Sequence, residues 1–487
     1  MDEIQPQSGE QVEPQSEAVE PRAATPAPAT QTWELSDLLS AVTLKELRQE
    51  LRLKSFTVLF IAPQFLMFLV TLLQVASSGE VFVATSIVPL AFWATLTIPL
   101  IILVPRRAFF SFNKEMQASS LELLLLTGLS ASKIVLGKWV ALAGEAFLFL
   151  IAMSPYVMLQ YFLGNPDMRS TLETIAGLFF ASLVIIALGL NLSASSRGRK
   201  HWGLMLIVMI IVGKVLTGWY TSSSRWTGGG SVAYVALDGY LTALTLGPLG
   251  ILLLLCGGAS RIAPLTENYA VVKRILGLLV VGVAIGLQLI GLRNVELVAM
   301  VSILILIPVA ASSLYEELHP ELVRRWLARK QSWKFLTHPG WPGGVIYTIL
   351  LTLLIVVLLA RTQLLGTIHP LSFYLYIIGI ILVPFAATMA LPIVALRTVP
   401  AYMILQLTIG FTLVIFMTSR LDELGLSAVL QYLPHYSLII ALAPPGATPV
   451  QISPHACHLA TALSVLIFGF AFRRMMRENQ RAATFVG

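Results

Sequence analysis

Residues 115–138 read EMQASSLELLLLTGLSASKIVLGK and connect two apolar runs, residues 81–104 and 139–163. Each run is long enough to cross a bilayer as a helix. The whole chain has the same character: 56% of its 487 residues are hydrophobic and 12% are charged, with a mean hydropathy of +0.81. A soluble protein carries about twice that share of charge. The sequence therefore predicts an all-α polytopic membrane protein.

Hydropathy along the chain predicts about twelve transmembrane helices. The first six are expected at residues 56–75, 81–104, 139–163, 172–194, 202–219 and 240–257. The second six are expected at residues 275–292, 295–311, 345–360, 373–396, 401–418 and 459–472. Long basic connections follow the second span of each set, at residues 105–138 and 313–344. This parallel predicts a six-plus-six duplication, although the residues themselves do not repeat.

Lysine and arginine clusters fall on one side of the predicted membrane. They precede the first span and follow the second, fourth, sixth, eighth and twelfth spans. The positive-inside bias therefore puts these clusters, and both termini, in the cytoplasm. The net charge of +7 is thus explained by topology and does not indicate nucleic-acid binding. Residues 1–32 are polar and Pro-rich and are expected to form a disordered cytosolic tail. Residues 33–274 and 275–487 are then two six-helix membrane units.

The connection at residues 115–138 has the pattern of a short capped helix. Ser119 and Glu122 have capping-box spacing, so a helix is expected to begin at Ser120. Leucines give it an apolar face, and Gly128 is a good stop. Ser130 or Ser132 can cap the next helix, which is expected to run into the third span. An alternative for the leucine-rich helix is burial in the lipid headgroups.

Residues 33–54 predict a second amphipathic helix, directly before the first span. Leucine and valine recur at helical spacing on one face, and charged residues fill the other. Such a helix is expected to lie along the inner membrane surface. An ordinary charged flank of the first span is the alternative.

Together these motifs resemble the permease subunit of type-2 ABC exporters. The matching features are K-E-L-R at residues 45–48, E-x(4)-S-L-E-L-L-L-L-T-x-L-S-x(3)-I-x-L-G-K at residues 115–138, and ASRIAPLTEN at residues 259–268. The resemblance covers about residues 45–274. The sequence departs from the family at Gly128, where proline is frequent, and in having about twelve expected spans instead of six. Residues 275–487 are a diverged second permease unit or an appended domain.

The resemblance implies that two helices contact a separate cytosolic ABC ATPase. The interfacial helix would use Lys45, Glu46, Leu47 and Arg48. The coupling helix would use Glu115, Ser119, Leu121, Glu122, Leu124, Thr127, Gly128, Leu129 and Ser130. The other expected partners are the bilayer of a bacterial inner membrane and a second permease chain. The chain has no G-x-x-x-x-G-K-[ST] phosphate loop. It is therefore expected to be a transport component that binds no cofactor and receives the work of ATP through its partner.

Polar residues inside the predicted spans are few. Glu145, in the third span, is the best intramembrane candidate, because a carboxylate there is costly and usually has a partner. Its structural explanation is a bond to a neighbouring helix or a side chain that snorkels toward the inner interface. His455, Cys457 and His458 match no strong metal-ligand spacing, and no catalytic set is recognisable. An ion-coupled secondary transporter and a membrane enzyme acting on lipid or polysaccharide remain the alternative functions.

Overall fold

The computed structural model describes the helical core of the chain. The described residues are 41–52, 54–76, 88–117, 130–162, 168–195, 231–264, 267–290, 295–316 and 340–359, with scattered positions between 379 and 477. The expected fifth span, residues 202–219, and the predicted helix that begins at Ser120 lie outside them. Only isolated helical positions are described in the last three expected spans.

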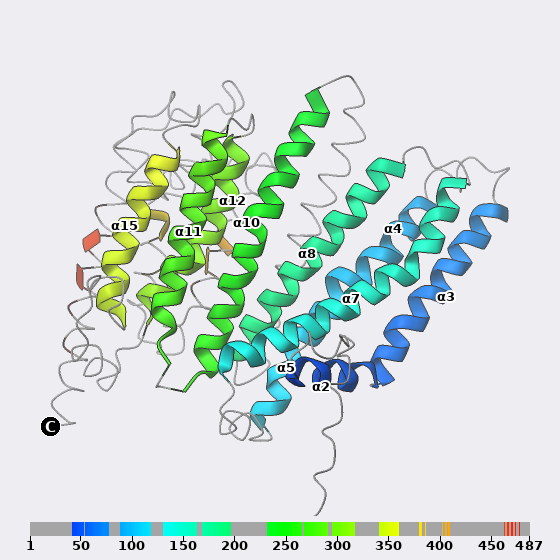
Figure 1. Cartoon of the computed structure of the whole chain (residues 1–487), viewed down its shortest axis with the longest axis horizontal. Coiled ribbons are helices and arrows are strands. Elements are labelled where there is room, and N and C mark those ends of the chain that lie inside the picture. Colours follow the sequence, from blue (N-terminus) through cyan, green and yellow to red (C-terminus); the bar gives the residue numbers. More distant parts are fainter. Residues whose placement is uncertain are drawn as a thin grey trace, which may run out of the picture. The chain divides into compact units, whose positions relative to one another are not determined.

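Every regular element in the described part of the chain is a helix. The elements are α2 (Ala41–Leu51), α3 (Lys54–Ala76), α4 (Val88–Ile98), the π-helix η2 (Pro99–Leu103), α5 (Val104–Gln117), α7 (Ala131–Phe162), α8 (Met168–Ser195), α10 (Ser231–Ile262), α11 (Tyr269–Leu289), α12 (Val295–Leu314) and α15 (Trp341–Leu359). Figure 1 shows most of them as long rods, with α2 lying crosswise to α3.

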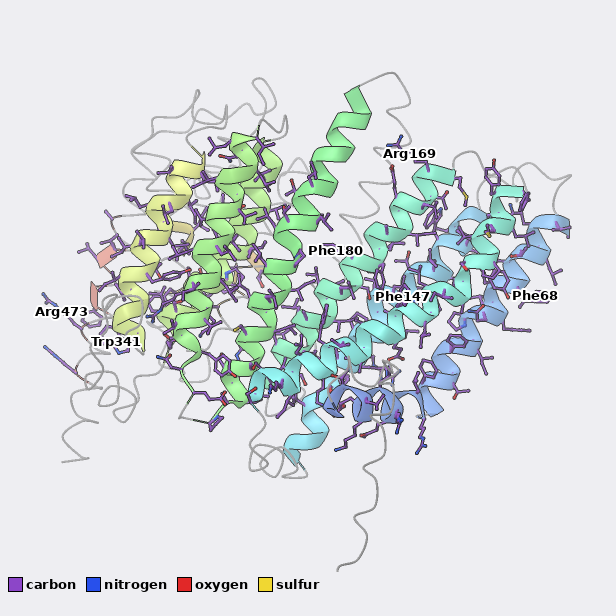
Figure 2. All side chains as sticks on the ribbon, viewed as in Figure 1. Phe68, Phe147, Arg169, Phe180, Trp341 and Arg473 are labelled. Carbon is purple, nitrogen blue, oxygen red and sulfur yellow. The ribbon has the colours of Figure 1, made fainter. Side chains whose placement is uncertain are left out.

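Six helices within the described residues are long and apolar enough to cross a membrane. They are Phe56–Ala76, Leu90–Phe112, Ala131–Phe162, Thr171–Ala194, Leu241–Ile262 and Tyr269–Leu289. Two further apolar helices, Val301–Leu314 and Gly343–Ile355, are shorter. Large apolar side chains on these rods are exposed, for example Phe68 and Phe147 (Figure 2). Water does not favour such surfaces, whereas lipid does. The chain is a membrane-embedded helical protein.

The second predicted span continues further than its hydropathy indicates. The connection expected to begin at residue 105 is helical as far as Gln117, because α5 follows η2 without a break. Ala108, Phe109 and Phe112 are fully buried on α5, and α5 packs along α8. This apolar stripe at helical spacing keeps the segment folded despite its charges. The helix of the second span therefore continues past residue 104, where the span was expected to end.

The π-helix η2 lies at the junction between α4 and α5. Its first residue, Pro99, has no N–H to donate to the helical ladder, and the N–H of Val104 donates to the Pro99 carbonyl. The buried Ser182 hydroxyl on α8 donates to the Leu100 carbonyl at 2.7 Å. A neighbouring helix therefore satisfies a carbonyl in the widened turn.

The described helices share two apolar clusters. The first is formed by α3, α4, η2, α5, α7, α8 and the C-terminal half of α10. The second is formed by α10, α11, α12 and α15, with Ile381, Phe385 and Tyr402. The helix α10 contributes to both. In the second cluster the backbones come close, because a Cβ at Gly344 would collide with the Ser313 carbonyl. Small residues allow such approaches between membrane helices.

Candidate functional site

The described part of the interfacial helix, α2, packs against α7. The four K-E-L-R residues divide between two faces. Glu46 is buried and Leu47 half-buried, and the Leu47 Cδ1 atom lies 3.8 Å from where a Cβ at Gly144 of α7 would be. Lys45 and Arg48 are exposed. Among the four residues expected to contact the ATPase, Glu46 therefore faces the chain's own helices. Lys45 and Arg48 remain available on the surface.

A buried ion pair joins α2 to α7. The Lys138 Nζ atom lies 3.0 Å from Glu46 Oε2, and the two side chains are 4% and 9% exposed. Lys138 also lies over the ring of Phe112 on α5, 5.5 Å from its centroid. The pairing explains how two charges can be held in a largely apolar environment, since each needs a close partner of opposite sign.

A second ion pair joins α7 to α5. Glu145, the intramembrane candidate, is only 1% exposed, and its Oε1 atom accepts from Nη1 of Arg107. Arg107 belongs to the basic cluster after the second predicted span, which the sequence analysis attributes to membrane topology alone. The structural explanation of Glu145, a bond to a neighbouring helix, is confirmed. Glu145 and Lys138 are seven residues apart on α7, which places them two turns apart on one side of the helix.

Further polar contacts connect this region to α8, α10 and α11. The Phe112 N–H donates to Ser193 Oγ at 3.1 Å. Arg261, in the segment that resembles the exporter family, donates to the carbonyl and side-chain oxygens of Asn191 at 2.7 and 2.8 Å. The N–H of Ser132 donates to the hydroxyl of Tyr269, the first residue of α11, at 3.1 Å. The start of α7 thus touches the start of α11.

The two ends of the predicted coupling segment are described. Glu115 lies in the last turn of α5, and Ser130 precedes α7. The Ser130 carbonyl accepts from the N–H groups of Lys133 and Ile134 at 3.0 and 3.3 Å. The predicted start of this helix is confirmed, as is its course through Lys138 into the span. The remaining coupling residues lie outside the described part of the chain: Ser119, Leu121, Glu122, Leu124, Thr127, Gly128 and Leu129.

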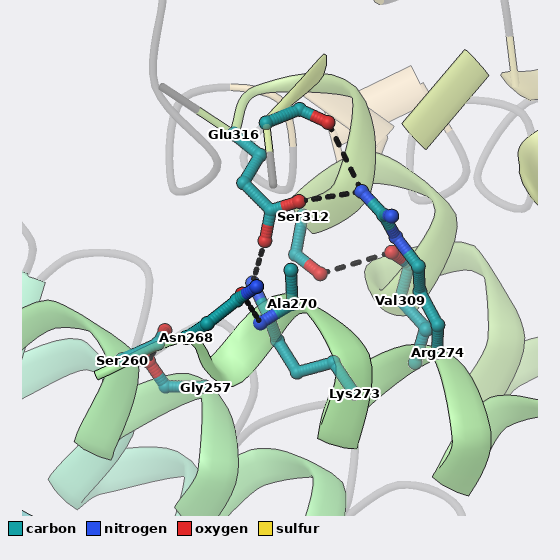
Figure 3. Close-up of polar contacts among 10 residues, drawn as sticks. Gly257, Ser260, Asn268, Ala270, Lys273, Arg274, Val309, Ser312 and Glu316 are labelled. Atoms are coloured by element: carbon teal, nitrogen blue, oxygen red, sulfur yellow. Dashed lines mark hydrogen bonds and ion pairs between the residues drawn. The ribbon is translucent and has the colours of Figure 1, made fainter. Parts of the chain in front are cut away.

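Another ionic cluster lies at the ends of α12 and α15 (Figure 3). Glu316 pairs with Lys273 at 3.0 Å and with Arg274 at 2.7 Å. Arg274 is fully buried and also donates to the Gly340 carbonyl at 3.0 Å. The Trp341 N–H donates to the Glu316 carbonyl. The Glu316 carboxylate therefore joins α12 to α11, and the backbone carbonyls of Glu316 and Gly340 connect these helices to the start of α15. The sequence signal for this buried cluster is the adjacent pair Lys273 and Arg274, one turn into α11. A helix that packs against neighbours on both sides must bury one of two adjacent side chains.

Metal-ligand chemistry has little basis in the described residues. They contain no group of three or more His, Cys, Asp or Glu side chains that could hold a metal ion. His455, Cys457 and His458 lie outside them. The ion pairs Glu46–Lys138 and Arg107–Glu145 and the cluster around Glu316 instead join one helix to another.

Removing Lys138 tests the energetic importance of the pair. We expect Lys138→Met to lower the free energy of unfolding by about 3–5 kcal/mol, because Glu46 is left buried without its cation. The double variant E46L/K138M should regain most of this loss, since an apolar pair often replaces a buried ion pair without cost. The measurement is denaturant unfolding in lipid nanodiscs. The matched control is Arg169→Met, whose partner Glu173 forms an exposed pair, with an expected loss below about 1 kcal/mol. Equal losses for the two single variants would contradict the prediction.

In comparisons with known proteins, no family model, no curated protein and no solved structure matches the chain.

Proposed function

We propose that this chain is the permease component of an ABC exporter, which couples a separate cytosolic ATPase to movement of a substrate across a bacterial inner membrane. The observation that carries the proposal is the leucine-rich capped segment at residues 118–129, which lies in the sequence between α5 and α7. Both of these helices continue into apolar rods long enough to span a bilayer. A push on the segment would therefore act directly on two spans.

The ion pairs support the same proposal. A segment that receives mechanical work needs a stiff connection to the rest of the protein. Glu46–Lys138 and Arg107–Glu145 join α2, α5 and α7, and α5 and α7 flank the segment in the sequence. The exposed cations Lys45 and Arg48 on α2 offer a surface for a cytosolic partner. The full permease would then have about twelve spans, with residues 275–487 or a second chain completing the substrate path.

The alternatives have less support. An ion-coupled transporter needs an intramembrane carboxylate that exchanges ions, but Glu145 is engaged by Arg107. An enzyme acting on lipid or polysaccharide needs a cluster of acid, base or nucleophile groups, whereas the carboxylates Glu46, Glu145 and Glu316 are each paired with a cation of another helix.

The deciding experiment is purification of the tagged chain from its native host into nanodiscs. We expect a subunit carrying a G-x-x-x-x-G-K-[ST] loop to co-purify, and its ATP hydrolysis to depend on the permease. Reconstituting the two components, with a variant ATPase that lacks the loop lysine as the control, tests the dependence. A chain that purifies without any ATPase and moves solute in response to a proton gradient alone would overturn the proposal in favour of secondary transport.

A further inference from the structure

We propose that α2, α5 and α7 form one rigid body, the input unit, and that Glu46 and Lys138 are the positioning residues that keep α2 in it. The input unit consists of Ala41–Leu51, Val104–Gln117 and the N-terminal half of Ala131–Phe162. Its proposed role in transport rests on the proposed function, whereas its rigidity is a property of this chain alone.

The charges on α7 carry the argument. Lys138 and Glu145 lie on one side of α7, and each is paired with a different helix: Lys138 with Glu46 of α2, and Glu145 with Arg107 of α5. The four charges balance within the unit. Separating either pair would take buried charges away from their partners of opposite sign in a region of low dielectric, which is strongly unfavourable. A motion that moves the three helices together leaves both pairs intact and avoids that cost.

The boundary of the input unit lies between α7 and α11. In the described part of the chain, a hydrogen bond from the Ser132 N–H to the Tyr269 hydroxyl connects these helices at 3.1 Å, and it lies at the exposed surface. An exposed neutral hydrogen bond is exchanged for water at little net cost. Helix α7 should therefore move more easily against α11 than against α2 or α5. Helix α11 packs in the second apolar cluster.

Two cross-links distinguish motion within the unit from motion at its boundary. Both start from a C256S/C457S background that has no native thiols. L47C/G144C joins α2 to α7, where the Leu47 side chain faces Gly144, and S132C/Y269C joins α7 to α11. After treatment with a short bifunctional thiol reagent, the first lock should keep at least about half of the permease-dependent ATP turnover. The second should lower turnover about tenfold, equal to about 1.4 kcal/mol in the rate-limiting barrier.

Charge reversal tests the positioning residues in a way that does not need the ATPase. The readout is amide hydrogen exchange of α2 in nanodiscs. K138E should raise exchange in α2 about thirtyfold by detaching it from α7, and the swap E46K/K138E should restore protection to within about threefold of the original chain. A general loss of folding would instead raise exchange in α12 as well, and the swap would not reverse it.

The outcomes separate the two proposals. Loss of turnover on the α2–α7 lock, with the ATPase still bound, overturns the input unit and leaves the exporter function standing. Protection of α2 that is indifferent to the charge at position 138 also overturns it. If no ATPase binds the chain at all, only the proposed function falls, because the hydrogen-exchange result still decides whether α2 and α7 form one body.

Discussion

Changing Leu124 to aspartate is expected to abolish binding of the cytosolic ATPase while leaving the membrane helices folded. Leu124 is in the middle of the leucine-rich segment. We expect the apolar face of this segment to be covered by a partner, because water does not favour such a surface. Truncating a central apolar anchor costs about 2 kcal/mol or more, and an unpaired carboxylate in its place adds a desolvation penalty. Affinity should therefore fall by about 100-fold or more.

The measurement is ATPase retained on the tagged permease in nanodiscs, with the unfolding midpoint of the permease as a check of its fold. Val19→Asp is the matched control, since it adds the same charge in the expected cytosolic tail and should leave binding unchanged. Undiminished binding by the Leu124 variant would mean that the leucine face has another use, such as an anchor in the headgroup layer. A parallel loss of binding and of thermal stability would place Leu124 within the chain's own packing.

The positions of the membrane helices could be predicted from the sequence because hydropathy is a local property. The first span was expected at residues 56–75 and α3 is Lys54–Ala76; the fourth was expected at residues 172–194 and α8 is Met168–Ser195. A run of apolar residues of this length has few structural alternatives in lipid. The second span was expected to end too early, at residue 104, because charged residues follow it. The buried stripe of Ala108, Phe109 and Phe112, which continues the helix, was visible in the sequence.

The partners of the charged residues could not be predicted. Glu46 and Lys138 are separated by 92 positions, and their pairing depends on how α2 crosses α7, which no local pattern specifies. The same holds for Arg107 and Glu145. Both basic residues belong to clusters that were assigned to membrane topology. A cation near a helix end can set orientation during insertion and then be buried against a carboxylate as the helices pack. One residue thus has two roles, and only the first is visible in the sequence.

Replacing Glu316 with alanine is expected to be the most destabilising single change among the described charged residues. The carboxylate serves two cations, Lys273 and the fully buried Arg274. Its removal takes the shared anion away from two neighbouring positive charges. The free energy of unfolding should therefore fall by at least as much as for a broken buried pair, about 3–5 kcal/mol. Glu316→Gln keeps the shape and one acceptor oxygen but not the charge, and should cost an intermediate amount. Denaturant unfolding in nanodiscs gives the values, with the exposed Glu173→Ala as the control.

The location of the damage makes the prediction specific. Arg274 also donates to the Gly340 carbonyl, and the Glu316 carbonyl accepts from the Trp341 N–H, so loss of the carboxylate should disturb the start of α15 through Arg274. Hydrogen exchange in the Glu316 variant should therefore increase first in the opening turns of α15 and remain unchanged in α2 and α7, which pack in the other apolar cluster or against it. Equal loosening of both regions would mean that the two clusters unfold together, and that α10 transmits the disturbance from one to the other.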